Sequence, residues 1–190
     1  MSCRRAGIPR PFLSRLLPAL LVGWFVLPAW ADTGAVSEYA IKAVLFYKLP
    51  QFVYLPDTAR ARDGDSATTL CGLGEHPVVD ALERLAQSPP QGRAPAYRTV
   101  DGVGGTGHCD LLFIAGDEAD RLDGILNRLR DKNLVTVSDI PGFAKAGGMV
   151  EFSRSPEKAG VQILINRKAA QKLGIEFNAQ LLRLARIVEP

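Results

Sequence analysis

A chain of 190 residues, 47% hydrophobic and 23% charged, shows no internal repeat and no low-complexity tract. Its formal net charge of +3 depends on residues 1–31, which hold four arginines and no acidic residue, so that the remainder carries −1. The basic balance of the whole chain therefore gives no reason to expect nucleic acid as a partner.

The leading segment has the pattern of a secretory signal. Its arginines precede an almost wholly apolar stretch, residues 16–28, and Ala29-Trp30-Ala31 fits the small-x-small cleavage rule. We expect cleavage of residues 1–31, which leaves residues 32–190 as one periplasmic domain without membrane insertion. The alternative is an uncleaved anchor, although the apolar stretch is shorter than the about 20 residues that span a bilayer.

The cysteines are consistent with export. Cys3 lies in the signal, so the mature chain keeps Cys71 and Cys109, an even pair in an oxidising compartment. We expect a disulfide between them, which in the chain-entropy model is worth about 4 kcal/mol for a loop of this size. Two buried free thiols are the alternative.

The first half of the domain predicts alternating helices and strands. Ser37 can cap a first helix that Pro50 ends. The apolar positions of this helix recur at helical spacing: Tyr39, Ala43, Phe46 and Tyr47. A strand over residues 67–74 and a helix within residues 76–88 follow, with the apolar stripe Val78, Val79, Leu82 and Leu85. Residues 97–100 and 110–115 predict two further strands, the second of them buried.

The second half begins with a helix that Asp117 caps and whose stripe is Leu122, Ile125, Leu126 and Leu129. Residues 134–137 predict a strand, and residues 149–153 and 161–165 an antiparallel hairpin. Asn178 can cap a final helix that turns Leu181, Leu184, Ala185 and Val188 inward. We therefore predict an α/β single-domain sandwich with flanking helices. Its mixed, mostly parallel sheet has about five or six strands and ends in a C-terminal β-hairpin plus helix.

The glycine-containing stretch VSDIPGFAKAGGMVEF, residues 137–152, is a candidate for a phosphate-binding loop. Its glycine pair leads into a strand and not into a helix N-terminus, so the order required for anion binding is wrong. We interpret it as a structural corner formed by Asp139, Pro141, Gly142, Phe143, Gly147 and Gly148. The alternative is that this corner forms part of a small-ligand or partner pocket.

Catalytic and metal-binding patterns are weak. The mature chain has two histidines, His76 and His108, far apart in sequence. His108-Cys109-Asp110 resembles part of a cysteine protease site, but neighbouring strand residues point to opposite faces. No Cys or His cluster has metal spacing. We therefore expect no enzyme, no metal and no cofactor.

Five motifs follow one another along the mature chain: EYAIKAVLFYKLPQFVYLP, LCGLG, CDLLFIA, LVTVSDIPGFAKAGGMVEF and VQILINRKAAQKLGIEFNAQLLRLARIV. In this order they resemble the YfiR family of periplasmic proteins from Gram-negative bacteria, and the resemblance covers nearly all of the mature chain. The resemblance implies a negative regulator. Such proteins bind the periplasmic sensor domain of a membrane diguanylate cyclase and repress cyclic di-GMP synthesis and biofilm formation. The first alternative is a solute-binding sensor acting on another receptor, such as a histidine kinase, and the second is a periplasmic enzyme.

Two positions depart from the family pattern. Leu55 stands before Pro56 where the family commonly has Trp, and a second cysteine pair found in some members is missing. Cys71 and Cys109 do match. Any redox control of partner release would therefore act through this one bond, whereas the alternative is a purely structural disulfide.

The partner surface is predicted at the edge of the hairpin. Alternation along residues 161–166 puts Val161, Ile163 and Ile165 on the core face. The remaining positions, with the lysine that follows, form the predicted contact: Gln162, Leu164, Asn166 and Lys168. The alternative is that a helix covers this face. Surplus aromatic surface along the first helix also predicts a homodimer.

Overall fold

The computed structural model describes residues 33–56, 68–88, 94–155 and 160–189, with side chains from Glu38 onward. The predicted signal and its cleavage site lie outside the described residues. The chain divides into two compact units, Met1–Ala31 and Asp32–Pro190, and all that follows concerns the second. None of the helices in the described ranges combines the length and apolarity that a bilayer crossing requires.

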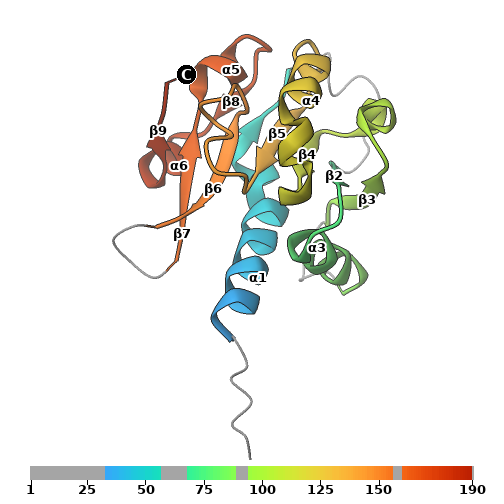
Figure 1. The fold of residues 1–190 in the computed structure, drawn as a ribbon. Coiled ribbons are helices and arrows are strands. Elements are labelled where there is room, and N and C mark those ends of the chain that lie inside the picture. Colours follow the sequence, from blue (N-terminus) through green and yellow to red (C-terminus); the bar gives the residue numbers. More distant parts are fainter. Residues whose placement is uncertain (1–32, 57–67, 89–93, 156–159, 190) are drawn as a thin grey trace, which may run out of the picture. The chain divides into compact units, whose positions relative to one another are not determined.

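A seven-stranded sheet forms the centre of the domain (Figure 1). Its strands, in spatial order, are β3 (Ala96–Val100), β2 (Thr69–Leu73), β4 (Leu111–Ile114), β5 (Val135–Ser138), β6 (Val150–Arg154), β7 (Val161–Ile165) and β9 (Arg186–Ile187). All neighbours run parallel except β6 and β7, which form the predicted antiparallel hairpin. The mostly parallel α/β class is confirmed, with one strand more than the sequence predicted.

Within the described ranges, the helices that flank the sheet are α1 (Thr33–Lys48), α3 (Pro77–Gln87), α4 (Leu122–Leu129), α5 (Arg167–Gln171) and α6 (Ala179–Leu184). The 3-10 segments in the same part of the chain are η1 (Leu49–Phe52), η2 (Val103–His108) and η3 (Gly116–Arg121). A separate antiparallel pair joins β1 (Val53–Tyr54) to β8 (Glu176–Phe177). Helix α1 begins before Ser37, so that predicted cap is wrong, whereas its end ahead of Pro50 is confirmed.

Apolar side chains fill both faces of the sheet. The sequence of strand β4 is continuously apolar because both of its faces are buried. Leu111 and Phe113 belong to the core under α1 and α3, and Leu112 and Ile114 belong to the core under α4. Figure 1 shows α4 over β4 and β5. Phe46 of α1 meets Phe113 edge to face, with ring centroids 5.6 Å apart. A strand buried on both faces needs no polar alternation.

Two local predictions fail for tertiary reasons. Asp117 does not cap a helix; its Oδ2 accepts a hydrogen bond from the backbone N–H of Glu75, 2.8 Å away, and so joins the loops that follow β2 and β4. The final helix is capped by Asn178 as predicted, but it stops at Leu184, whose side chain is exposed. The chain then pairs with β7 as strand β9, an edge too short to detect by periodicity.

Candidate functional site

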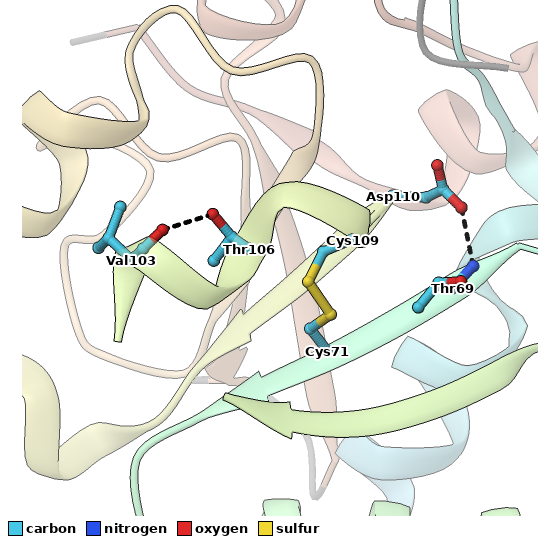
Figure 2. Close-up of a disulfide and its surroundings, with 6 residues drawn as sticks. All are labelled: Thr69, Cys71, Val103, Thr106, Cys109 and Asp110. Atoms are coloured by element: carbon cyan, nitrogen blue, oxygen red, sulfur yellow. Dashed lines mark hydrogen bonds between the residues drawn. A yellow bond between two sulfur atoms is a disulfide. The ribbon is translucent and has the colours of Figure 1, made fainter. Parts of the chain in front are cut away.

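The expected disulfide is present and lies inside the sheet. Cys71 lies in β2, and Cys109 lies two residues before the neighbouring strand β4 begins. Their Cα atoms are 5.8 Å apart, and Figure 2 shows the bond crossing between the two strands. Both residues are fully buried in the core on the α4 side. A reductant reaches this bond only when the sheet opens locally, which favours a structural role over a redox switch.

Two hydrogen bonds hold the chain around the disulfide (Figure 2). Asp110 Oδ2 accepts from the backbone N–H of Thr69 at 2.7 Å and so joins the first residue of β2 to the entry of β4. Thr106 Oγ1 donates to the carbonyl of Val103 at 2.8 Å and closes η2. The disulfide thus reinforces a junction that is already hydrogen-bonded.

The corner between β5 and β6 is built around Phe143. This side chain is fully buried, and a Cβ on Gly148 would collide with its ring. Gly142 and Gly147 have φ values of +83° and +112°, a region that glycine occupies without steric cost. Pro141 is exposed at the turn. Here the glycines serve a tight turn and a close backbone approach.

Two buried side chains, Glu151 in β6 and Asn166 just after β7, form hydrogen bonds with the backbone of this corner. Glu151 of β6 is 3% exposed, and its carboxylate accepts from the backbone N–H groups of Gly142 and Ala144 at 3.1 and 3.0 Å. Asn166 is 1% exposed. Its Nδ2 donates to the Ala144 carbonyl at 2.9 Å, and its Oδ1 accepts from Ala169 N–H at 3.0 Å, capping α5. Asn166 therefore does not face a partner, because both ends of its amide are bound internally.

The other three predicted contact residues lie at the surface or near it. Cross-strand register places Leu164 opposite Glu151 and Gln162 opposite Ser153. Gln162 and Leu164 are half-buried. Lys168 is exposed, and its Nζ lies 3.2 Å from a carboxylate oxygen of Glu189. Val161 and Ile163 pack against the core under α1, as the alternation predicted.

A buried ion cluster joins α1 to the corner, and sequence reasoning missed it. Lys42 Nζ lies 3.0 Å from Asp139 Oδ2 and 2.9 Å from Glu38 Oε1. The side chains of Lys42 and Asp139 are 7% and 6% exposed. Arg154, at the protein surface, donates to Glu38 Oε2 at 2.7 Å. The only sequence signal was a Glu and a Lys four residues apart in a helix, a spacing that is more often a solvated pair.

Charge and burial act in opposite directions on this cluster. Burial by itself would lower the pKa of Lys42, but hydrogen bonds and charges from Glu38 and Asp139 outweigh it and raise that pKa. Hydrogen bonds from Lys42 and Arg154 lower the pKa of Glu38. The fold therefore stabilises the ionised forms of Lys42 and Glu38 at neutral pH.

The cluster lies beside a topological switch point of the sheet. From β2 the chain passes through α3 to β3 on one side, whereas β4 lies on the other side of β2 and leads through α4 to β5. Open α/β sheets commonly bind ligands at such a point, but here the loops after β2 and β4 are joined, because Asp117 Oδ2 accepts a hydrogen bond from the backbone N–H of Glu75 at 2.8 Å. His76 follows β2, Gly116 follows β4 and Asp139 follows β5.

The two histidines are separated by the fold. His76 is the N-cap of α3, beyond the carboxyl end of β2, whereas His108 ends η2 before the amino end of β4. Because β2 and β4 are parallel, these positions are at opposite ends of the sheet. Within the described ranges, no three His, Cys, Asp or Glu side chains are grouped as a metal site requires.

An open, mostly parallel sheet with flanking helices, a buried disulfide, an internally hydrogen-bonded corner and a buried ion cluster defines a small α/β domain. The sequence profile of the YfiR/HmsC-like family matches residues 39–186, and the chain belongs to this family. Proteins of this family are regulatory rather than catalytic. No curated protein matches the chain with significance.

Two solved structures are similar to parts of this chain. One is the ABC domain in complex with L-Trp from Streptococcus pneumoniae, with a TM-score of 0.54 and 12% identity over 78% of this chain. The other is a conserved domain protein from Vibrio cholerae O1 biovar eltor, with a TM-score of 0.49 and 11% identity over 70% of this chain. This chain spans 60% and 58% of those proteins. At 12% identity the likeness to the first of them concerns the fold alone.

Proposed function

We propose that the mature chain is a periplasmic negative regulator that binds the periplasmic sensor domain of a membrane diguanylate cyclase. Binding would hold the cyclase inactive and so lower cyclic di-GMP and biofilm formation. The observation that carries the proposal is the YfiR/HmsC-like match across residues 39–186. The signal-like residues 1–31 and the disulfide agree with an oxidising compartment.

The contact surface of this proposal is the hairpin face that carries Gln162 and Leu164, extended by Lys168. On the opposite face Val161 and Ile163 are committed to the core. The corner covers the far end of the contact face, because Glu151 and Asn166 bind its backbone there. A half-buried leucine beside an amide and an ammonium offers both apolar area and polar specificity.

A pull-down from detergent-solubilised membranes of the source bacterium tests the proposal. The bait is the oxidised mature protein, and we expect it to retain a membrane protein with a diguanylate cyclase domain. Gln162→Arg combined with Lys168→Glu should lower that retention while leaving the melting temperature unchanged. The control is Lys145→Glu, another charge reversal of an exposed lysine, on the corner. Equal retention by all three proteins would place the contact elsewhere.

Homodimerisation is a second part of the proposal. The apolar surface available for it is smaller than the sequence predicted. Phe46, Tyr47 and Val53 are buried within the domain. Ile41 and Val44 on α1 and Tyr54 on β1 are the large apolar side chains of this region that remain exposed. Light scattering that gives the mass of one chain at tens of micromolar would contradict a dimer.

A further inference from the structure

A pocket of about 260 Å³ opens at the carboxyl end of the sheet, on the side that α4 covers. Leu73, the last residue of β2, reaches it from the sheet. One wall is the segment that follows β3, and the other is formed by η3 and α4, which follow β4. The loops beyond the carboxyl ends of parallel strands are where α/β sheets commonly bind ligands.

The base of this pocket is apolar and held in place. Leu73, Val103 and Ile125 line it, are at most 7% exposed, and belong to the core on the α4 side. Val103 begins η2, and its carbonyl accepts from Thr106 Oγ1 at 2.8 Å, which closes that turn (Figure 2). A ligand would therefore meet a fixed apolar surface at the bottom of the pocket.

The rim carries charges of both signs. Among the described residues, two carboxylates, Asp101 and Glu118, and two guanidiniums, Arg121 and Arg128, line the pocket. Arg121 binds the buried Glu118 at 2.6 Å. Asp101 and Arg128 are exposed, and neither makes an ion pair within the described part of the chain. A guanidinium only donates hydrogen bonds and a carboxylate only accepts them, so the pocket presents unused groups of both kinds.

Gly124 keeps the pocket open between the two arginines. Arg121 ends η3, and Gly124 and Arg128 follow in α4 at intervals of three and four residues, which places them on one side of the helix. A Cβ on Gly124 would meet nothing within 4 Å, and its φ lies outside the left-handed region. Neither packing nor backbone requires glycine here, although glycine is less stable than alanine inside a helix.

We propose that this pocket binds a small uncharged polyhydroxyl compound such as a monosaccharide. Each hydroxyl group both donates and accepts, so one ligand can satisfy the guanidinium of Arg128 and the carboxylate of Asp101, while its carbon face covers the apolar base. Because the charges of the lining balance, it attracts neither an anion nor a cation from solution. A zwitterion would meet exposed charges, where ion pairs contribute little. The site goes beyond the proposed function and needs no cyclase.

Titration of the oxidised mature protein by ¹H–¹⁵N NMR tests this site. The probes are glucose, galactose, mannose and N-acetylglucosamine, with acetate, methylammonium and glycine as the anion, the cation and the zwitterion. We expect at least one sugar, and none of the charged probes, to shift the amide signals of Asp101, Gly102 and Gly124 in a saturable way, in the millimolar range. Gly124→Leu should abolish this response, because the leucine side chain fills the pocket, and should not lower the melting temperature.

Arg128→Met keeps the apolar stem and removes the donors, so it should weaken sugar binding at least about tenfold. The matched control is Arg130→Met, which removes an exposed guanidinium two residues further on, outside the pocket, and should bind as the wild type does. A linear, unsaturated response to all four sugars would overturn the proposal. Saturable binding of acetate, methylammonium or glycine at these residues would overturn the ligand class. Unchanged sugar affinity in Gly124→Leu and Arg128→Met would overturn the position.

Discussion

Replacing Lys42 with methionine should destabilise the domain more than any surface charge change. Methionine keeps the length and apolar stem of the side chain but removes the ammonium that lies 3.0 Å from Asp139 Oδ2 and 2.9 Å from Glu38 Oε1. Glu38 keeps Arg154 as a partner, whereas Asp139, only 6% exposed, would lose the cation that neutralises it. The main effect is an uncompensated buried carboxylate.

The size of the effect follows from what such carboxylates cost. Breaking a buried pair by removing one partner costs about 3–5 kcal/mol. For a domain of roughly 150–250 residues, each kcal/mol shifts the melting temperature by about 2–4 °C. We therefore expect a fall of at least about 6 °C at neutral pH, measured by circular dichroism on oxidised protein.

A double-mutant cycle separates the ion pair from the packing of the two side chains. Lys42→Met, Asp139→Asn and the double variant are compared, and the double variant should be more stable than the two single losses added together. Lys145→Met, an exposed lysine on the corner, is the control and should melt like the wild type. Strict additivity, or a Lys42→Met variant within 1–2 °C of the wild type, would refute the coupling.

Three further predictions concern pH, the disulfide and the corner. The raised pKa of Lys42 gives stability that is present below its ordinary pKa of 10.5 and is lost as the pH rises through the pKa of the folded state. The lowered pKa of Glu38 gives stability that is present above its ordinary pKa of 4.5 and is lost as the pH falls through the pKa of the folded state. The melting difference between the wild type and Lys42→Met should thus be flat around neutral pH and shrink at both extremes; a difference that peaks in acid would contradict it. Replacing Cys71 and Cys109 together with alanine opens a loop with a sequence separation of 38 and should cost about 4 kcal/mol, whereas dithiothreitol without denaturant should leave the buried bond intact for hours by mass spectrometry. Gly148→Ala should lower the free energy of unfolding by about 1–3 kcal/mol, because its methyl group would collide with the buried Phe143 ring. In the same urea titration, Gly124→Ala in α4 should raise it by up to about 1 kcal/mol. Equal unfolding midpoints for the two variants would contradict the tight packing of Phe143 against Gly148.

Sequence patterns were sufficient wherever one element carried its own signal. The apolar stripe Val78, Val79 and Leu82 is buried as predicted, because a helix period read over one segment needs no partner to be recognised. The continuous apolar run of β4 predicted a strand buried on both faces, and the two cores confirm it. The disulfide followed from compartment and cysteine count.

The failures concern contacts between distant segments. Lys42 and Asp139 are separated by 97 positions, so no local pattern could distinguish their buried pair from a solvated one. Leu184 fitted a helical stripe, but pairing of β9 with β7 ended the helix and left that side chain exposed. Asn166 continues the alternation of β7 by one residue, yet its amide binds the corner at one end and caps α5 at the other.

The central claim is repression of a membrane cyclase from the periplasm. The most direct measurement is cellular cyclic di-GMP, by mass spectrometry, in a strain that expresses the cyclase retained in the pull-down. We predict that the full chain lowers the dinucleotide severalfold, and that the chain without residues 1–31, which stays in the cytoplasm, does not. An unchanged level with the exported chain, or an equal fall with the unexported one, would contradict the account.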